Sequence, residues 1–145
     1  MAVVEGERLL QKALNSFALD LDKAVDDAVV MTAVDVTNIA VKSINTPSQG
    51  RRYVKKDKKG NVKVHIASQE GEAPNTDEST LVNNVTYTHD KGSKVAFVGT
   101  HIKYGALLEV EKNRPWLEPA KLEGEKGFAD RMKLAVSNQV KKAGK

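Results

Sequence analysis

The chain has 145 residues, no cysteine and a net charge of +4. This length suits one domain that buries a core without metals or disulfides, and the lack of cysteine excludes disulfides, thiolate metal ligands and cysteine nucleophiles. The acidic start lacks the basic and apolar regions of a signal peptide, and no apolar run approaches the ~18 residues of a membrane-spanning helix. We therefore expect a soluble protein made in a cytoplasm, forming a single domain over residues 1–145.

The charge is unevenly distributed along the chain. Residues 1–50 carry seven acids and four bases, residues 51–65 carry seven bases against Asp57 alone, and residues 66–82 carry four acids and no base. The positive charge is therefore a local cluster together with a basic tail, and it does not extend over the whole domain.

Residues 5–45 have the apolar periodicity of a helical segment. Apolar residues recur at steps of three and four residues, forming one stripe of Leu10, Leu14, Phe17, Leu21, Ala24, Ala28 and Met31. Asn15-Ser16, Asp20 and Asp22 are residues that cap helix starts, so the pattern predicts a short helix followed by a long one, with a single unbroken helix as the alternative. Thr46-Pro47 should end the segment, because the residue before a proline is driven out of the helical region.

Residues 46–80 form a polar, charged stretch with little periodicity, punctuated by glycines and Pro74. Only Val62–Ile66 alternates like a strand. A segment of this length without regular structure is uncommon in a compact domain unless it has a function. We expect a protruding hairpin or an extended arm.

Residues 84–99 contain two strand-like runs, Asn84–Thr88 and Lys94–Gly99, separated by a loop of turn residues. This arrangement predicts a β-hairpin. The segment Tyr104–Val110 fits either a short helix or a further strand.

Residues 117–142 have a helical pattern, with Pro119 in the first turn, where its missing N–H costs nothing. Gly124 and Gly127 weaken the early part, so a kink or a later start is compatible with the pattern. The order of helix, arm, strands and helix predicts an α+β fold: an antiparallel β-sheet packed against a long N-terminal helical segment and a C-terminal helix, with an extended charged arm.

Residues that carry chemistry are sparse. His65, His89 and His101 have no metal-ligand spacing. The adjacent acids Asp26-Asp27 would diverge on a helix, and Asp77-Glu78 lie in a Ser/Thr-rich loop, where such a pair is normally solvated. No nucleophile elbow, phosphate-binding loop or dinucleotide motif occurs. We expect no catalytic residue, no cofactor and no metal, and so a protein that is not an enzyme.

The basic cluster is the strongest electrostatic feature of the sequence. It is either a solvated loop or a contact with phosphates or with an acidic partner surface, made by Arg51, Arg52, Tyr53, Lys55, Lys56, Lys58 and Lys59. With Tyr53 as its only aromatic residue it gives weak support to a base-stacking platform, and no recognition-helix pattern accompanies it.

A second candidate contact is Arg114 with Trp116, in a segment stiffened by the prolines on either side of the tryptophan. Trp116 is either a core anchor, which we favour, or a hot spot between subunits.

The order of several short motifs resembles one family, the head–tail joining proteins (tail-component or tail-completion proteins) of tailed phages. The earlier matches are Thr46-Pro47, Gly50, Tyr53, His65-Ile66-Ala67-Ser68, Gly71-Glu72-Ala73-Pro74 and Leu81. The later matches are Val98-Gly99-Thr100, Tyr104-Gly105, Leu108-Glu109-Val110 and Arg114-Pro115-Trp116-Leu117-Glu118-Pro119-Ala120. The last of these is the most specific. The chain departs from the family pattern at Glu78-Ser79-Thr80, where the family usually has Thr-Gly, and at Glu111-Lys112-Asn113, which leads to Arg114 without the family's Gly-Thr.

The resemblance implies a structural protein of the phage neck, located in the virion and in the host cytoplasm during assembly. It implies other copies of this chain as partners, in a hexameric ring, together with connector or portal-side proteins of the head and tail-tube or tail-terminator proteins. Duplex DNA would pass through the ring without sequence-specific binding, and no membrane would be involved. The alternative suggested by the charge is a basic nucleic-acid-binding module of phage or prophage origin.

Overall fold

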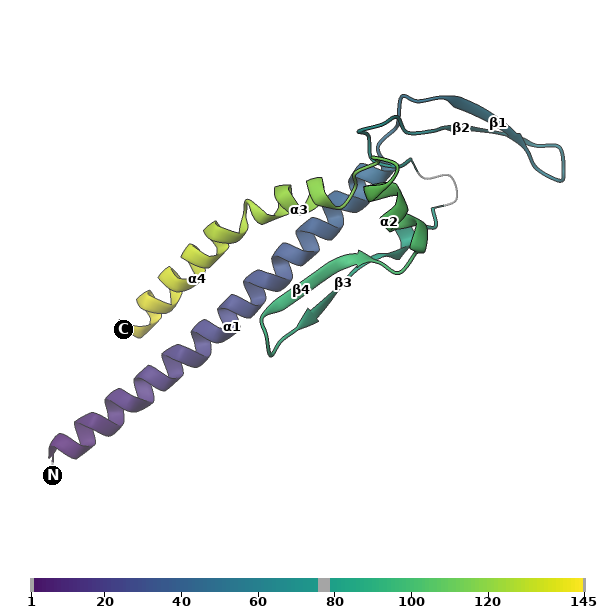
Figure 1. Cartoon of the computed structure of the whole chain (residues 1–145). Helices are drawn as coiled ribbons and strands as arrows, with labels where there is room; N and C mark the ends of the chain where they lie inside the picture. The colour runs from purple at the N-terminus through teal and green to yellow at the C-terminus, as the bar shows by residue number, and fades with distance from the viewer. Residues whose placement is uncertain (1, 76–78, 145) are drawn as a thin grey trace.

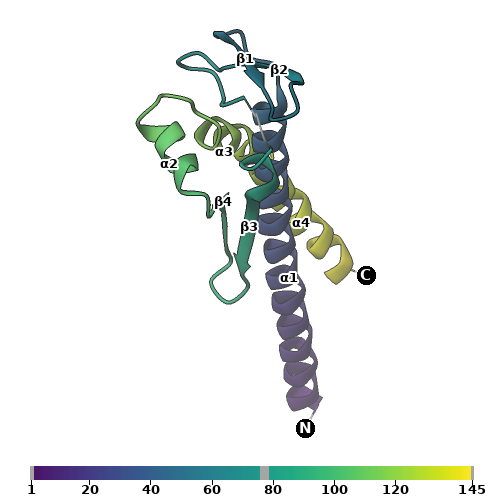
Figure 2. The same ribbon diagram turned by 90° about the vertical axis from the view of Figure 1, so that its right-hand side faces the viewer.

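The computed structural model describes residues 2–75 and 79–144, with side chains from residue 6 onward. It has an α+β fold in which one long helix, α1 (Ala2–Asn45), forms the axis. A β-hairpin runs along one side of this axis and the C-terminal helices run along another, while a second hairpin projects beyond the end of α1 (Figures 1 and 2). The α+β prediction is confirmed, although the strands form two separate sheets and not one.

Helix α1 is unbroken, so the prediction of a short helix followed by a long one is wrong and its alternative is correct. The side chains that suggested a second helix start make other hydrogen bonds and do not cap a helix. Asn15 accepts a hydrogen bond from Gln11 within the helix, and Asp20 accepts one from Lys142. The helix ends before Pro47, as predicted.

The strands form two antiparallel hairpins. Strands β1 (Arg52–Lys56) and β2 (Val62–Ile66) make the projecting hairpin within the arm predicted at residues 46–80. Strands β3 (Val85–Asp90) and β4 (Val95–Thr100) make the hairpin predicted at residues 84–99 and pack on α1. A short 3-10 helix, η1 (Val82–Asn84), precedes β3.

Three helices complete the chain. The segment predicted to be either a short helix or a further strand is a helix, α2 (Lys103–Val110). The predicted single helix over residues 117–142 is instead two helices, α3 (Glu118–Glu125) and α4 (Phe128–Ala143). The break falls at Lys126 and Gly127, where the glycine content of the segment allowed a kink.

Gly124 explains how closely α3 approaches α1. A Cβ at this position would lie 2.5 Å from a methyl carbon of Val36 and 3.1 Å from its backbone nitrogen. Only a residue without a side chain permits this contact. Glycine thus lowers the helix propensity of α3 but allows α3 to pack closely against α1.

The core lies at the C-terminal end of α1. It is small, and its buried members are Val36, Ala40, Ile44, Leu81, Trp116 and Ala120. It joins α1, the start of η1 and the entry to α3. The N-terminal half of α1 lies outside this core.

Two backbone positions coincide with the departures noted in the sequence. Ser79 has φ of 58° and Asn113 has φ of 47°, both in the left-handed region that favours glycine. The turns at both places are thus made by residues other than glycine. Asn113 is among the types that tolerate this conformation best.

Candidate assembly surfaces

Glu109 on α2 fastens the start of α3. Its carboxylate accepts hydrogen bonds from three consecutive backbone N–H groups, those of Trp116 at 2.7 Å, Leu117 at 3.0 Å and Glu118 at 2.9 Å. These donors have no partner inside a helix, so one side chain satisfies the N-terminus of α3 and favours it by its negative charge. The two motifs that contain Glu109 and Trp116 are therefore one structural unit.

Trp116 is 2% exposed and lies inside the core, so the core-anchor interpretation is confirmed. The alternative, in which this side chain contacts a partner at the surface, is wrong. Its Nε1 donates to the carbonyl of Gly105 at 3.1 Å. Arg114 is half-buried beside it and donates to the carbonyl of Lys112 at 3.0 Å. The two residues thus hold the α2–α3 connection together.

The residues of the predicted basic cluster lie on the projecting hairpin, and its two faces differ. In an antiparallel pair, directly opposed residues share a face. One face carries the pairs Val54–Val64, Lys56–Val62 and Arg52–Ile66, and the other carries Tyr53–His65 and Lys55–Lys63. The guanidinium of Arg51 stacks 5.4 Å from the centre of the Tyr53 ring. Lys58 and Lys59 lie in the turn.

The first of these faces is an exposed aliphatic stripe, which sequence reasoning missed. It is made of Val54, Val62, Val64 and Ile66, all of them exposed in the chain. The alternation that would have indicated it is clear only in β2, because lysines and arginines interrupt β1. A two-stranded hairpin alone is marginally stable, so a covered stripe would stabilise it.

The base of the hairpin is tightly closed. A Cβ on Gly50 would lie 2.2 Å from the carbonyl oxygen of Ala67, so only glycine fits there. The carboxylate of Glu72 accepts hydrogen bonds from the backbone N–H of Gln69 at 2.8 Å and of Gln49 at 3.3 Å. Glu70 accepts one from the Asn113 amide at 3.0 Å. Two acids of the block at 66–82 are thus engaged within the chain, while Asp77 and Glu78 lie outside the described residues.

The turn of the hairpin is organised by Asp57. Its carboxylate accepts hydrogen bonds from the Asn61 amide and from the backbone N–H groups of Lys59 and Asn61, each at 2.8 Å. These bonds, the one from the Asn61 side chain foremost, lower the pKa of Asp57 from its ordinary value of 3.8.

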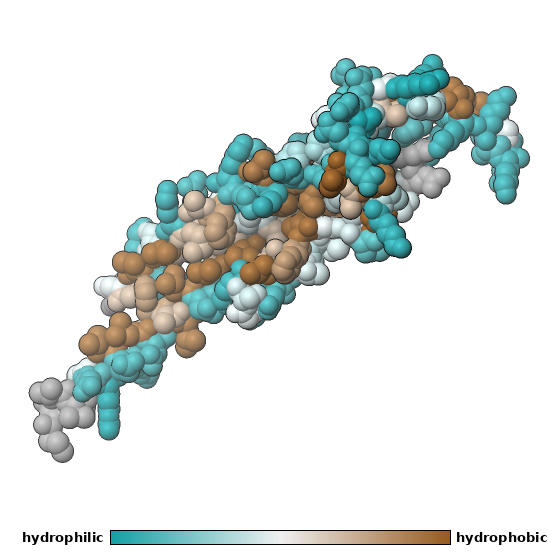
Figure 3. Space-filling view, in the orientation of Figure 1, coloured by the Kyte–Doolittle hydropathy of each residue, from teal (hydrophilic) through white to brown (hydrophobic). Residues whose placement is uncertain are grey.

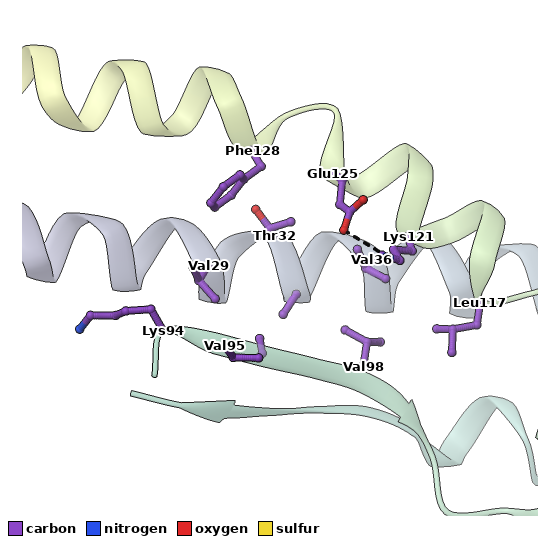
Figure 4. A pocket seen from close by; sticks show the side chains of 12 residues that line it. Val29, Thr32, Val36, Lys94, Val95, Val98, Leu117, Lys121, Glu125 and Phe128 are labelled. Carbon is purple, nitrogen blue, oxygen red and sulfur yellow. Dashed lines mark ion pairs between the residues drawn. The ribbon is translucent and has the colours of Figure 1, made fainter. Parts of the chain in front are cut away.

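An open apolar groove of about 550 Å³ runs along α1 between β4 and the C-terminal helices. Its apolar lining consists of Val29, Ala33, Val36, Val95, Ala96, Val98 and Phe128, with Leu117 at one end. The labelled side chains in Figure 4 reach into it from α1, from β4 and from the C-terminal helices. Figure 3 shows hydrophobic surface gathered along this part of the molecule. We call it the α1–β4 groove.

Polar side-chain contacts link the walls of the α1–β4 groove to α1. Lys94 at the start of β4 lies 2.8 Å from Asp22, and this hydrogen bond raises the pKa of Lys94 above 10.5. His89 Nε2 lies 2.8 Å from Asp26 Oδ1. On the other side, Arg131 of α4 pairs with Asp35. Both walls of the groove are therefore linked to α1 by side-chain contacts.

The first part of α1, up to about residue 16, extends past the other elements that the structure describes (Figure 1). Residues 6–16 are exposed, and Lys142 of α4 lies 2.6 Å from Asp20, the next polar contact along α1. Four leucines lie on this part of the helix with more than half of their surface in solvent: Leu9, Leu10, Leu14 and Leu19. The sequence predicted the stripe containing Leu10 and Leu14 but not that it lacks a covering element.

Comparisons with known proteins found no matching family model, no similar curated protein and no similar solved structure. Within residues 2–75 and 79–144, no group of three or more histidine and acidic side chains is placed to hold a metal ion. No described helix has the length and apolar character needed to cross a membrane.

Proposed function

We propose that this protein is a structural subunit of a tailed-phage neck, which assembles as a ring and joins the DNA-filled head to the tail. The observation that carries the proposal is the unit formed by Glu109 and the segment Arg114–Ala120. The motifs that most resemble head–tail joining proteins meet there in space and set the entry to α3. The contact of these two motifs supports the proposal because it gives them a shared structural role.

The distribution of apolar surface supports an assembling protein. The chain exposes the aliphatic stripe of the hairpin, the leucines of α1 and the α1–β4 groove, and it keeps only a small core for itself. Large exposed apolar patches in a folded protein mark interaction sites. A subunit whose stability is completed by its neighbours has this distribution.

We assign the projecting hairpin to a protein neighbour and not to the DNA channel. A lumen lined by seven bases per subunit would grip phosphates and oppose the passage of DNA. The aliphatic stripe adds a separate argument, since β-branched side chains at 39–60% exposure are suited to a protein surface. Basic residues around such a stripe would set the register on an acidic neighbour.

Charge reversal of the hairpin tests this assignment. In a phage lysate that lacks this protein, the added chain should restore joining of filled heads to tails, and a variant with Lys55, Lys56, Lys58 and Lys59 changed to Glu should not. Its circular dichroism should be unchanged, because none of these side chains is in the core.

The matched control changes four exposed lysines elsewhere to Glu: Lys103, Lys112, Lys133 and Lys141. It should keep joining activity, since the net charge changes equally. If the hairpin variant joins heads to tails but the particles lose DNA, the hairpin lies on the DNA and the assignment is wrong. Failure of the unaltered chain to restore joining contradicts the neck function itself.

A nucleic-acid-binding module is the second candidate, and one observation favours it. The face opposite the aliphatic stripe gathers Tyr53, Lys55 and Lys63, with Arg51 stacked on the tyrosine. Cations of this kind bind phosphates with an affinity that falls steeply with salt. Binding of the free chain to duplex DNA, lost on raising the salt and lost in the hairpin variant, would favour this function.

A further inference from the structure

The hydrogen bonds of the projecting hairpin show which backbone groups of β1 bond to β2. In an antiparallel pair, directly opposed residues exchange backbone bonds at every second position. The N–H of Ala67 donates to the carbonyl of Arg51 at 3.0 Å, and the N–H of Asp57 donates to the carbonyl of Asn61 at 3.0 Å. In the register of the hairpin, the residues of β1 that bond to β2 are therefore the odd-numbered ones.

The even-numbered residues of β1 turn their backbone groups outward. Arg52, Val54 and Lys56 direct their N–H and C=O groups away from β2, and all three residues are exposed. Among residues 2–75 and 79–144, β1 pairs with no strand other than β2, and no further backbone hydrogen bond reaches these groups. A row of such groups at a sheet edge is a template for pairing with another strand.

The outer edge of β2 is different, because the chain itself occupies part of it. The same alternation turns the carbonyl of Ile66 outward, and the side-chain amide of Asn75 donates to it at 2.6 Å. A strand added along β2 would have to displace this bond. The edge of β1 is therefore the better site for a further strand.

The side chains along this edge define what the added strand should carry. Arg52, Val54 and Lys56 lie on the face of the aliphatic stripe and follow one another in the order basic, apolar, basic. Directly opposed side chains on neighbouring strands interact, favourably for opposite charges and unfavourably for like charges. The complementary strand therefore carries an acid, an apolar residue and an acid at every second position.

The chain does not supply such a strand to a second copy of itself. In the whole sequence only one pair of acidic residues lies four positions apart, Asp22 and Asp26. Both belong to helix α1, where side chains of the β3–β4 hairpin contact their carboxylates. Antiparallel pairing of two β1 strands centred on Val54 would set Arg52 against Lys56, which like charge opposes. The occupant is therefore a strand of a different protein.

We propose that the outer edge of β1 binds an extended strand of a different protein, which joins the hairpin as a third strand. Its acidic residues lie opposite Arg52 and Lys56, and an apolar residue lies opposite Val54. Main-chain hydrogen bonds give such pairing its affinity and the alternate side chains give it specificity. A third strand also stabilises a hairpin that is marginal alone. The inference rests on the proposed function for the source of the strand, a head-side or tail-side protein.

A synthetic peptide, Thr-Glu-Thr-Val-Thr-Glu-Thr, tests the site because it carries the expected pattern in residues that include strand formers. Added at millimolar concentration to the isotope-labelled chain, it should shift the amide resonances of Arg52, Val54 and Lys56 and protect these amides from exchange with solvent. The amide of Tyr53, which already faces β2, should gain little protection. Absence of these changes overturns the inference.

Two altered peptides separate strand pairing from simple attraction of charges. A version with Lys in place of both Glu residues should not bind. A version methylated at every backbone nitrogen keeps its charges but has lost its N–H donors, so it should bind at least tenfold more weakly. Equal binding of the methylated and unmethylated peptides would show ionic attraction alone and would overturn the inference.

Val54→Pro and Val64→Pro form a matched pair of variants. Each removes one valine of the aliphatic stripe and one outward N–H, so the bonds between β1 and β2 stay in place, and proline is tolerated at edge positions of this kind. Val54→Pro should weaken peptide binding at least tenfold, whereas Val64→Pro, on the other edge, should leave it unchanged. Protection of the Tyr53 amide checks the hairpin in both. If Val54→Pro loses the hairpin, the methylated peptide decides.

The outcomes separate this inference from the proposed function. In the phage lysate that lacks this protein, Val54→Pro should fail to restore joining and Val64→Pro should restore it. Joining by both variants contradicts the inference and leaves the neck function standing. Peptide binding at β1 by an unaltered chain that does not restore joining contradicts the neck function and leaves the strand site standing. Shifts of the outward amides with duplex DNA but not with the peptide would assign this edge to nucleic acid and overturn the inference.

Discussion

Glu109 shows how much one side chain can determine about a connection. Three backbone N–H groups converge on its carboxylate, and it is the element that lets Trp116 enter the core with its own backbone satisfied. Hydrogen bonds to charged groups contribute more than neutral ones, and donors left without a partner carry a desolvation cost.

Glu109→Ala should therefore lower the free energy of unfolding by about 2–3 kcal/mol, measured by urea denaturation. Glu111→Ala provides the control two residues away, where the side chain is exposed, and its change should stay within about 0.5 kcal/mol. Equal effects of the two substitutions would contradict the role assigned to Glu109.

Asp57 makes the turn of the hairpin sensitive to acid. Its pKa is lowered in the folded turn, so the ionised form favours the fold. The contribution is present above the unfolded value of 3.8 and is lost as the pH falls through the folded value. The amide resonance of Asn61 should thus shift with a midpoint below pH 3.8 in an NMR titration.

Asp57→Asn removes the titrating group and should abolish that shift of the Asn61 amide. A midpoint at or above 3.8 in the unaltered chain would mean that the turn does not hold the carboxylate.

At the scale of elements, α1 combines two regions of different support. Its C-terminal half packs against β3, β4, α3 and α4, whereas residues 6–16 are exposed. In the free monomer, backbone amides of residues 8–18 should exchange with solvent far faster than those of residues 32–44, because local opening there breaks no tertiary contact.

Hydrogen-exchange mass spectrometry measures this difference. Assembly should slow exchange in residues 8–18, where packing on a neighbour is expected. Uniform protection along α1 in a sample that native mass shows to be monomeric would contradict the picture of an unsupported helix end.

The sequence predicted the elements whose own residues form a recognisable local pattern. The apolar stripe of α1, the alternation of β2 and the turn residues between β3 and β4 are local patterns, and each appears in the structure. Strand β1 was missed because it is mostly basic and pairs only through β2. The unbroken α1 could not be chosen over two helices, since Asp20 bonds to Lys142, which is 122 residues away in the sequence.

The candidate surfaces were less accessible from sequence than the elements. Local composition identified Arg51–Lys59 as a candidate surface, and the flanking prolines identified Trp116. The role of Glu109 has no such local signal, because it depends on backbone groups seven to nine residues away. The α1–β4 groove depends on how far β4 and α3 stand from one another. No local pattern encodes that separation.

At the scale of the whole molecule, the chain is far from spherical. A helix of 44 residues is about 66 Å long, whereas a compact domain of 145 residues has a radius of gyration of about 15 Å. Small-angle scattering of the monomer should give a radius clearly above that value. A value near 15 Å in a monomeric sample would show that α1 folds back on the rest of the chain.

Because α1 is unbroken, a rotation about one of its ends displaces the elements at its other end. The groove is built on the C-terminal half of α1, and the hairpin follows the last residue of α1 after a linker of six residues, 46–51, closed by the tight contact at Gly50. A tilt of 5° about the N-terminal end would move the other end by roughly 6 Å. A small change in the angle of α1 at its N-terminal end would therefore move the hairpin by more than the spacing between neighbouring strands.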